Sequence, residues 1–259
     1  MKITTLIENT TTSPALIAEH GLSLYIETPS HNILFDMGQT DAFAQNGQHL
    51  GIDLGKVDLA VLSHGHYDHG GGLKTFLSMN DHAKVYLSRH AFGAHYNGTE
   101  KYIGLAEELK NESRLIPVGD EMHLAKGLTL YSCNTFAPIE PLQPYGLNKK
   151  VGEAFLPDDF LHEQYLLLEE AGKRVLISGC SHKGIVNIAS WFTPDVLVGG
   201  FHFMKLTDHA ALKAAADRLC SHPTRYITGH CTGAEQYALL KQYMGDQLDL
   251  LSTGKAIDL

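Results

Sequence analysis

The sequence predicts an α/β fold, in which strands and helices alternate along the chain. The chain has 259 residues, of which 44% are hydrophobic and 19% charged, as is usual for a globular protein with a buried core. Short runs rich in Leu, Ile and Val recur between segments whose apolar residues have helical spacing. Several of these runs end on histidine or cysteine beside glycine, as expected at the carboxyl ends of strands in α/β layers.

The first half of the chain begins with a hairpin and continues with alternating elements. Residues 22–28 and 32–36 form the predicted hairpin, because both are rich in Leu, Ile, Tyr and Phe and a Pro-Ser pair lies between them. We then expect, in order, a weak helix over 40–50, a buried strand over 57–64, a helix over 71–79, a strand over 84–88, further helix over 91–96 and 100–112, and a strand over 128–134.

Four prolines interrupt the middle of the chain, and a long loop is therefore predicted over 135–160. After it we expect a hairpin over 164–180 around Ala171-Gly172, then a helix over 184–192, a strand over 195–202, a helix over 208–219 and a strand over 225–230. The last two strands and the helix between them form a βαβ unit, whose strands should be parallel neighbours. All elements are assigned to one domain over 1–259.

Composition and charge restrict the partners of the protein. The formal net charge is -9, which argues against the basic surface that nucleic-acid binding requires and favours a small-molecule substrate. No stretch approaches the roughly 18 apolar residues of a membrane span, and no basic segment precedes an apolar run near the N-terminus. We therefore expect a cytoplasmic protein without a membrane partner. The four cysteines are scattered and are expected to be free thiols.

The segment HGHYDHGGG at 64–72 is the strongest candidate for a metal site. His64 and His66 can point the same way from an extended segment, while Asp68 and His69 can face a second position just beyond. Imidazole nitrogens and a carboxylate suit zinc, iron or manganese. Burying these groups without partners would cost on the order of 1–3 kcal/mol each, which disfavours a histidine-rich turn without a ligand. The segment therefore predicts one or two divalent metal ions, with zinc favoured over iron or manganese.

Three later strands also end on residues that bind metals or protons. Because ligands gather at the carboxyl ends of strands, we expect Cys180, His182 and His230 as metal ligands and His202 as a catalytic residue. Simpler interpretations stand beside these: His182 as a helix cap, His202 as a satisfied core histidine, and Cys180 as a small buried apolar side chain. Histidines in polar or loop-like contexts, His95 among them, are assigned no role.

The sequence resembles the metallo-β-lactamase superfamily, whose signature H-x-H-x-D-H is matched by His64, His66, Asp68 and His69. It also resembles a narrower branch, the 7,8-dihydropterin-6-yl-methyl-4-(β-D-ribofuranosyl)aminobenzene 5′-phosphate synthase-like proteins. That likeness lies in blocks that span nearly the whole chain in order: ILFDMGQ at 33–39, LSHGHYDHGGGL at 62–73, ISGCSHKGIVN at 177–187, GGFHF at 199–203 and HCTG at 230–233.

The resemblance implies a four-layer αβ/βα sandwich with two metal ions in a cleft at the strand ends. It implies that Asp36 supports the metal ligands from behind, that His230 is the late metal-binding histidine, and that Cys180 or His182 replaces a bridging aspartate. The family's third histidine, expected before the hairpin at 164–180, has no clear match, and His162 is the nearest.

The implied activity is hydrolysis of a small ester or phosphodiester by a metal-activated water, which Asp68 would orient as well as binding metal. One alternative is the transferase chemistry of the branch, in which a dihydropterin diphosphate condenses with an aminobenzene ribofuranosyl phosphate. Another is a metal-bearing binding or regulatory protein without strong turnover.

Overall fold

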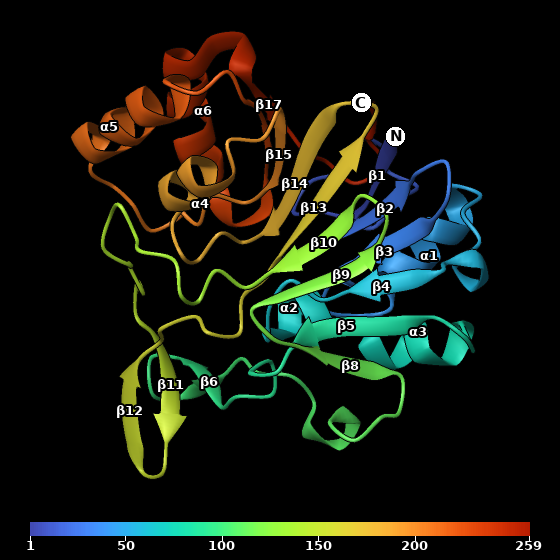
Figure 1. The fold of residues 1–259 in the computed structure, drawn as a ribbon. Helices are drawn as coiled ribbons and strands as arrows, with labels where there is room; N and C mark the ends of the chain where they lie inside the picture. Colours follow the sequence, from blue (N-terminus) through green and yellow to red (C-terminus); the bar gives the residue numbers. More distant parts are fainter. The chain divides into compact units, whose positions relative to one another are not determined.

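The computed structural model describes all 259 residues, which divide into two compact units. Unit 1 comprises Met1–Gly119, Gly146–Gln164 and Ser252–Leu259, and unit 2 comprises Asp120–Tyr145 and Tyr165–Leu251. Each unit contains a seven-stranded mixed sheet with helices packed on it, so the predicted α/β class is confirmed (Figure 1). That the two units form one domain over 1–259 stays a prediction.

The large sheet of unit 1 has the strand order β18-β1-β2-β3-β4-β5-β8. Its first four strands pair antiparallel, and β3, β4, β5 and β8 pair parallel. The bounds are β1 Lys2–Ile7, β2 Ser23–Glu27, β3 Asn32–Phe35, β4 Leu59–Val61, β5 Lys84–Ser88, β8 Leu115–Val118 and β18 Ala256–Asp258. The predicted hairpin, now β2 and β3, and the predicted strands β4 and β5 are confirmed.

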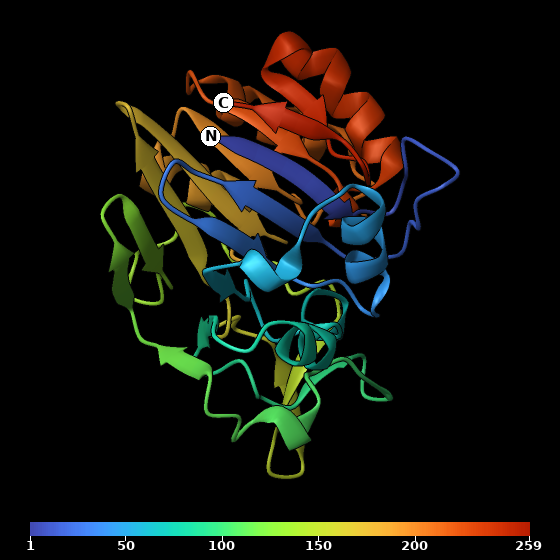
Figure 2. The same ribbon diagram turned by 90° about the vertical axis from the view of Figure 1, so that its right-hand side faces the viewer.

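Helices α1 (Ala42–His49) and α3 (Leu73–Met79) pack on one face of this sheet, where Figures 1 and 2 show them together. Phe43 of α1 and Phe76 of α3 are fully buried against Leu34 and Val85 of the strands. Both helices were predicted. The short elements between them are η1 (Leu54–Lys56) and α2 (Tyr67–Gly70), and η2 (Glu107–Leu109) lies farther along the chain.

A second sheet of unit 1 corrects two predictions. Its four antiparallel strands have the order β12-β11-β6-β7, with bounds β6 His95–Asn97, β7 Lys101–Tyr102, β11 Leu147–Val151 and β12 Ala154–Pro157. The helix expected over 91–96 and 100–112 is wrong apart from the short 3-10 turn η2, because glycines interrupt this stretch, 95–97 pairs with β11 and 101–102 pairs with β6. The loop expected over 135–160 is partly wrong. Pro157 is tolerated there, since it ends the edge strand β12.

The sheet of unit 2 has the order β17-β16-β15-β14-β13-β10-β9. The strands from β9 to β14 pair antiparallel, and those from β14 to β17 pair parallel. The bounds are β9 Glu121–Ala125, β10 Leu128–Tyr131, β13 Tyr165–Glu170, β14 Lys173–Gly179, β15 Val196–Gly199, β16 Arg225–Thr228 and β17 Leu248–Leu250. The predicted hairpin β13–β14 and the parallel βαβ pair β15–β16 are confirmed.

Helices α4 (Ile185–Phe192), α5 (His209–Cys220) and α6 (Ala234–Met244) pack beside one face of the unit 2 sheet (Figure 1). Ile188, Leu212 and Leu240 are buried there against Leu197 and Tyr226 of the strands. The side chain of Asp208 caps α5 by accepting hydrogen bonds from the N–H groups of the first turn. Two short 3-10 turns, η3 (His230–Thr232) and η4 (Gly245–Gln247), complete the unit.

The apolar content of the helices bears on the membrane prediction. None of the helices combines enough length with enough hydrophobicity to span a bilayer.

Candidate metal centre

Two parallel strands of unit 1 bring the first predicted site residues together. Asp36 follows the end of β3, and Ser63 and His64 follow the end of β4. The backbone N–H of Asp36 donates to the carbonyl of Val61 at 2.9 Å, which fixes the two strand ends side by side. Asp36 has a φ of 58°, a left-handed conformation that costs a non-glycine residue free energy and occurs often at functional sites.

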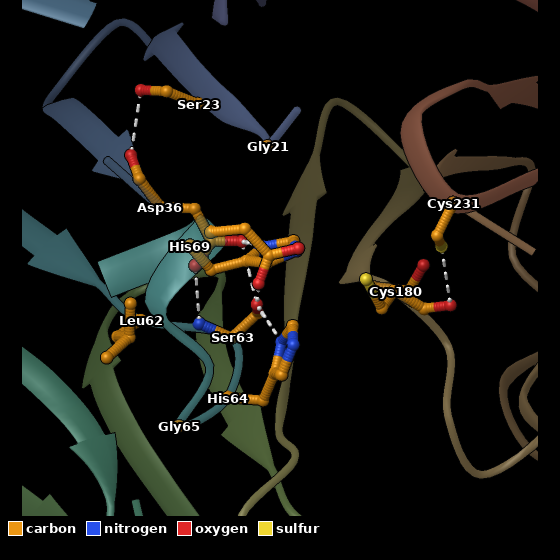
Figure 3. Close-up of polar contacts among 12 residues, drawn as sticks. Gly21, Ser23, Asp36, Leu62, Ser63, His64, Gly65, His69, Cys180 and Cys231 are labelled. Atoms are coloured by element: carbon orange, nitrogen blue, oxygen red, sulfur yellow. Dashed lines mark hydrogen bonds and ion pairs between the residues drawn. The ribbon is translucent and has the colours of Figure 1, made fainter. Parts of the chain in front are cut away.

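The Asp36 carboxylate is fully buried and accepts three hydrogen bonds (Figure 3). Its Oδ1 accepts from the Ser63 N–H at 2.7 Å, and its Oδ2 accepts from the Ser63 hydroxyl at 2.7 Å and from Nδ1 of His69 at 2.6 Å. Because the Ser63 hydroxyl donates its one hydrogen to Asp36, its oxygen must accept from Nδ1 of His64, 2.8 Å away. Both histidines therefore carry their proton on Nδ1.

In the neutral imidazoles this tautomer makes Nε2 the metal-binding atom of His64 and His69. Metal-binding histidines usually have their other ring nitrogen hydrogen-bonded in this way, to a carboxylate or a similar acceptor. The ring of His64 lies 4.6 Å from that of His66 and 4.2 Å from that of His69, measured between centroids. Burial lowers the pKa of His66 well below its ordinary value, with further lowering by His162, which favours the neutral imidazole that metals require. The donor set of unit 1 thus fits a divalent metal.

Asp68 lies at the margin of this group. Its side chain is 13% exposed, and its Oδ2 lies 4.0 Å from Nε2 of His69 and 3.4 Å from Nε2 of His20. A carboxylate with this partial access to solvent can bind metal, orient a water molecule, or do both. His20, which gave no signal in the sequence, is a further polar neighbour of the site.

Glycines in the motif allow the backbone to pass closely. A Cβ at Gly65 would lie 2.1 Å from the carbonyl oxygen of Ala91, and one at Gly72 would lie 2.3 Å from that of Met37. Neither position has room for a side chain, so the loop can take this path only with glycine.

A second buried group in unit 1 was not predicted. His66, His95, Asp158 and His162 are all buried, and one potential ligand atom from each lies within 4.8 Å of the others. The rings of His95 and His162 lie 3.8 Å apart between centroids. No sequence signal connects His95 with Asp158, because they are brought together only when β6 pairs with β11. His162, the nearest sequence match to the family's third histidine, therefore lies in this group beside His66.

The Gly65 N–H and the Asp158 carboxylate determine which ring nitrogens of His162 and His95 carry a proton. Nδ1 of His162 accepts from the Gly65 N–H at 2.9 Å, so its proton is on Nε2, 3.5 Å from Asp158 Oδ2. Nδ1 of His95 donates to the same oxygen at 2.8 Å, and Nε2 of His95 has no hydrogen-bond partner. Burial raises the pKa of the Asp158 carboxyl, but the neighbouring His162 and the hydrogen-bonded His95 outweigh it and hold this pKa well below its usual range.

Unit 2 gathers its own predicted residues at the carboxyl ends of three parallel strands. Cys180 and His182 follow β14, His202 follows β15, and His230 follows β16. Ligand atoms of Cys180, His182 and His202 lie within 4.8 Å of one another, and so do those of Cys180, His230 and Cys231. His202 and His230 have φ values of 55° and 46°, so these loop ends store backbone strain as Asp36 does.

Cys231 is a candidate ligand that the sequence did not single out. Its Sγ donates to the carbonyl oxygen of Cys180 at 3.4 Å (Figure 3). Burial raises the pKa of this thiol, but hydrogen bonds with Cys180 and His202 and the neighbouring His230 hold it well below its ordinary value. A thiol with a lowered pKa is a better metal ligand. The sequence signal that could have identified Cys231 as a candidate ligand is its position next to His230 in HCTG.

A cavity of about 340 Å³ lies within unit 2 beside these donors. It is lined by His182 and His202 together with the aromatic side chains of Tyr145, Phe201 and Phe203. Mostly apolar walls with a few polar groups are typical of small-molecule sites. Nδ1 of His202 is buried without a hydrogen-bond partner, which distinguishes it from the satisfied core histidine considered above.

Within each unit, the structure thus groups the residues that the sequence proposed. Asp36, His64, His66 and His69 cluster in unit 1 with Asp68 at their margin; Cys180, His182, His202 and His230 cluster in unit 2. Their individual roles as ligands or catalytic groups stay predictions.

Comparisons with known proteins identify the family of the chain. The family model of the Metallo-beta-lactamase superfamily matches residues 17–227. An uncharacterized protein of Methanocaldococcus jannaschii is 30% identical over 253 residues, covering 92% of this chain and 93% of that one. A second protein of that organism, named 7,8-dihydropterin-6-methyl-4-(beta-D-ribofuranosyl)-aminobenzene-5'-phosphate synthase, is 28% identical over 275 residues, covering 93% and 90%.

Among solved structures, Tm1679, described as a metal-dependent hydrolase of the beta-lactamase superfamily, superposes with a TM-score of 0.83 at 26% identity. The match covers 100% of this chain and 99% of that one. This likeness confirms the predicted metallo-β-lactamase fold, with its two mixed sheets and flanking helices. By its sequence, its fold and its buried histidine-rich candidate metal site, the chain belongs to the metallo-β-lactamase superfamily.

Proposed function

We propose that the protein is a metal-dependent hydrolase of a small ester or phosphodiester. The observation that carries the proposal is the Asp36–Ser63 network, which holds a proton on Nδ1 of both His64 and His69, so that in the neutral imidazoles Nε2 carries the lone pair. Burying the Asp36 carboxylate and holding its backbone in a left-handed conformation both cost free energy, and the orientation of metal ligands accounts for both features. Zinc suits the imidazole donors best, with iron and manganese as alternatives.

A divalent ion bound by the 64–69 cluster would supply an acidified water and a positive charge for the developing oxyanion. The residues of the chain hold the remaining roles. His64, His66 and His69 would hold the ion through neutral imidazoles, and Asp36, directly and through Ser63, keeps His69 and His64 in the required tautomer. The partly exposed Asp68 carboxylate would accept a hydrogen bond from the attacking water and so orient it.

In unit 2, His182 and His230 are proposed as metal ligands, with Cys180 as the alternative to His182. His202 is proposed as a catalytic residue, because it lines the apolar cavity and its Nδ1 has no protein partner. From Nε2 or Nδ1, an imidazole there can transfer a proton to a leaving-group oxygen. The cavity fits a small molecule, in agreement with the proposal that the substrate is not a nucleic acid.

The description of Tm1679 as a metal-dependent hydrolase supports hydrolysis. The 28% identical synthase of M. jannaschii supports a second candidate, the transferase that condenses a dihydropterin diphosphate with an aminobenzene ribofuranosyl phosphate. The same metal ligands serve both, because both reactions require a positive charge beside a departing or developing oxyanion.

The test is a substrate screen with metal-loaded protein, with and without chelator. It should include phosphodiesters, thioesters, lactones and the two substrates of the transferase reaction. Chelator-sensitive hydrolysis that is lost in Asp68→Ala supports the proposal. Condensation without hydrolysis identifies the transferase, and metal binding without turnover on any substrate identifies a binding or regulatory protein.

A further inference from the structure

A cavity in unit 1 concentrates positive charge in a chain whose formal net charge is -9. It has a volume of about 320 Å³ and lies outside the 64–69 cluster. Arg89, Lys110, Lys149 and Lys150 line it, and Asp159 is the one carboxylate among its lining residues. With four cations and one carboxylate the lining of this cavity carries a net positive charge, whereas the net charge of the whole chain is negative.

The cations are only partly neutralised by the protein. Arg89 and Lys110 form no ion pair. Lys149 pairs with Asp159, and Lys150 lies 3.6 Å from Glu153, whose side chain is fully exposed. An ion pair with so exposed a carboxylate contributes little and leaves Lys150 able to bind another anion.

Ordered backbone positions these side chains. Arg89 follows β5, and its N–H donates to the carbonyl of Val118 at 3.0 Å. A Cβ at Gly119 would lie 2.2 Å from Nη2 of Arg89, so the guanidinium passes over a residue without a side chain. Lys149 and Lys150 belong to β11, where the N–H of Lys150 donates to Ala94 at 2.8 Å. The cations thus come from two sheets of one unit.

Two histidines of the second buried group also line the cavity. His95 and His162 line it, and both belong to the buried group that includes His66. An anion in the cavity would therefore lie against the histidines that pack on a candidate metal ligand. This location suits the charged end of a substrate better than an unrelated surface ligand.

We propose that this cavity binds the phosphate group of a small-molecule substrate. A guanidinium offers paired donors that match phosphate oxygens, and lysines add point charges around it. The volume exceeds the space that a lone phosphate needs and falls in the range of small-ligand sites. The inference rests on the proposed function in one respect, that the phosphate belongs to the substrate. It narrows that function to phosphorylated substrates.

The test is calorimetric titration of the metal-loaded full chain with phenyl phosphate, phenol, pyrophosphate and inorganic phosphate. Phenyl phosphate should bind, and phenol should not. Arg89→Ala and Lys110→Ala should each weaken phenyl phosphate binding about tenfold, as expected for loss of a charged hydrogen bond. Lys84→Ala, an exposed lysine of the same unit outside the cavity, is the matched control and should bind as wild type does.

Asp68→Ala separates this inference from the proposed function, because it should abolish turnover and leave phosphate binding intact. Equal binding by wild type, Arg89→Ala and Lys110→Ala would overturn the inference, since the anion would then bind elsewhere, such as on the metal. Binding of inorganic phosphate without phenyl phosphate would also overturn it, as a site for the free anion. A single-stranded oligonucleotide that binds through Arg89 and Lys110 where phenyl phosphate does not would assign the cavity to nucleic acid instead.

Discussion

Replacing Asp36 by asparagine should weaken metal binding without removing any proposed ligand. The asparagine amide has nearly the same shape, but its NH2 group replaces one acceptor oxygen. If the NH2 takes the place of Oδ1, it faces the N–H of Ser63, which is a fixed donor. If it takes the place of Oδ2, it faces Nδ1 of His69, which must then release its proton. That proton moves to Nε2 and blocks the lone pair that binds the metal.

The expected loss follows from these contacts. Changes to residues that orient metal ligands commonly cost roughly 10–100-fold in metal affinity or activity, and Asp36→Asn should fall in that range. Leaving a fully buried group badly paired should also lower the free energy of unfolding by about 1–3 kcal/mol.

Two measurements check these values: competition with a chelator of known affinity gives the metal Kd, and urea unfolding of the metal-free protein gives the stability. Asp217→Asn, which alters an exposed ion pair, is the control and should match wild type in both. Wild-type metal affinity and stability in Asp36→Asn would refute the assignment of Asp36.

Three further predictions follow from the donor groups of the two units. His66→Ala and Asp68→Ala should each abolish turnover and lower metal content, measured by plasma mass spectrometry; a fully active variant would remove that residue from the site. In unit 2, Cys180→Ser should keep most metal and activity and His182→Ala should lose both, and the opposite pattern would assign the ligand role to the thiolate. Asp158→Asn should be less stable than wild type at neutral pH. Burial raises the pKa of Asp158, but His162 and His95 lower it to well below the unfolded value, so its stabilisation is present above that value and lost as pH falls. The difference in unfolding free energy should therefore shrink below about pH 4, and a difference independent of pH would contradict this.

The parts of the fold that sequence reasoning predicted are those where local pattern and tertiary context agree. The strand before His64 is short and wholly buried between two parallel neighbours, which agrees with the short apolar run that predicted it. The helix expected over 91–96 and 100–112 failed because residues 95–97 pair with β11, which lies at 147–151 in the chain. Charged and polar residues are compatible with both a surface helix and an exposed edge strand, and only the partner strand decides between them.

The residues of the candidate site likewise fall into two sets, those that local sequence spacing predicted and those that only the fold brings together. His64, His66, Asp68 and His69 are close in sequence, so their spacing alone predicted a cluster. Ser63 could not be predicted as the link between Asp36 and His64, because a serine before a histidine has no distinctive spacing and its role depends on the pairing of β3 with β4. The same limit applies to the His95–Asp158 contact.

The measurement that tests the metal site most directly is the metal content of protein purified after metal-supplemented expression, with unfolding followed before and after chelation. We predict about one to two equivalents of zinc, iron or manganese, and a lower melting temperature once the metal is removed, because bound metal stabilises the folded state by mass action. Less than about a tenth of an equivalent, with no gain in stability or activity when metal is added back, would contradict the account.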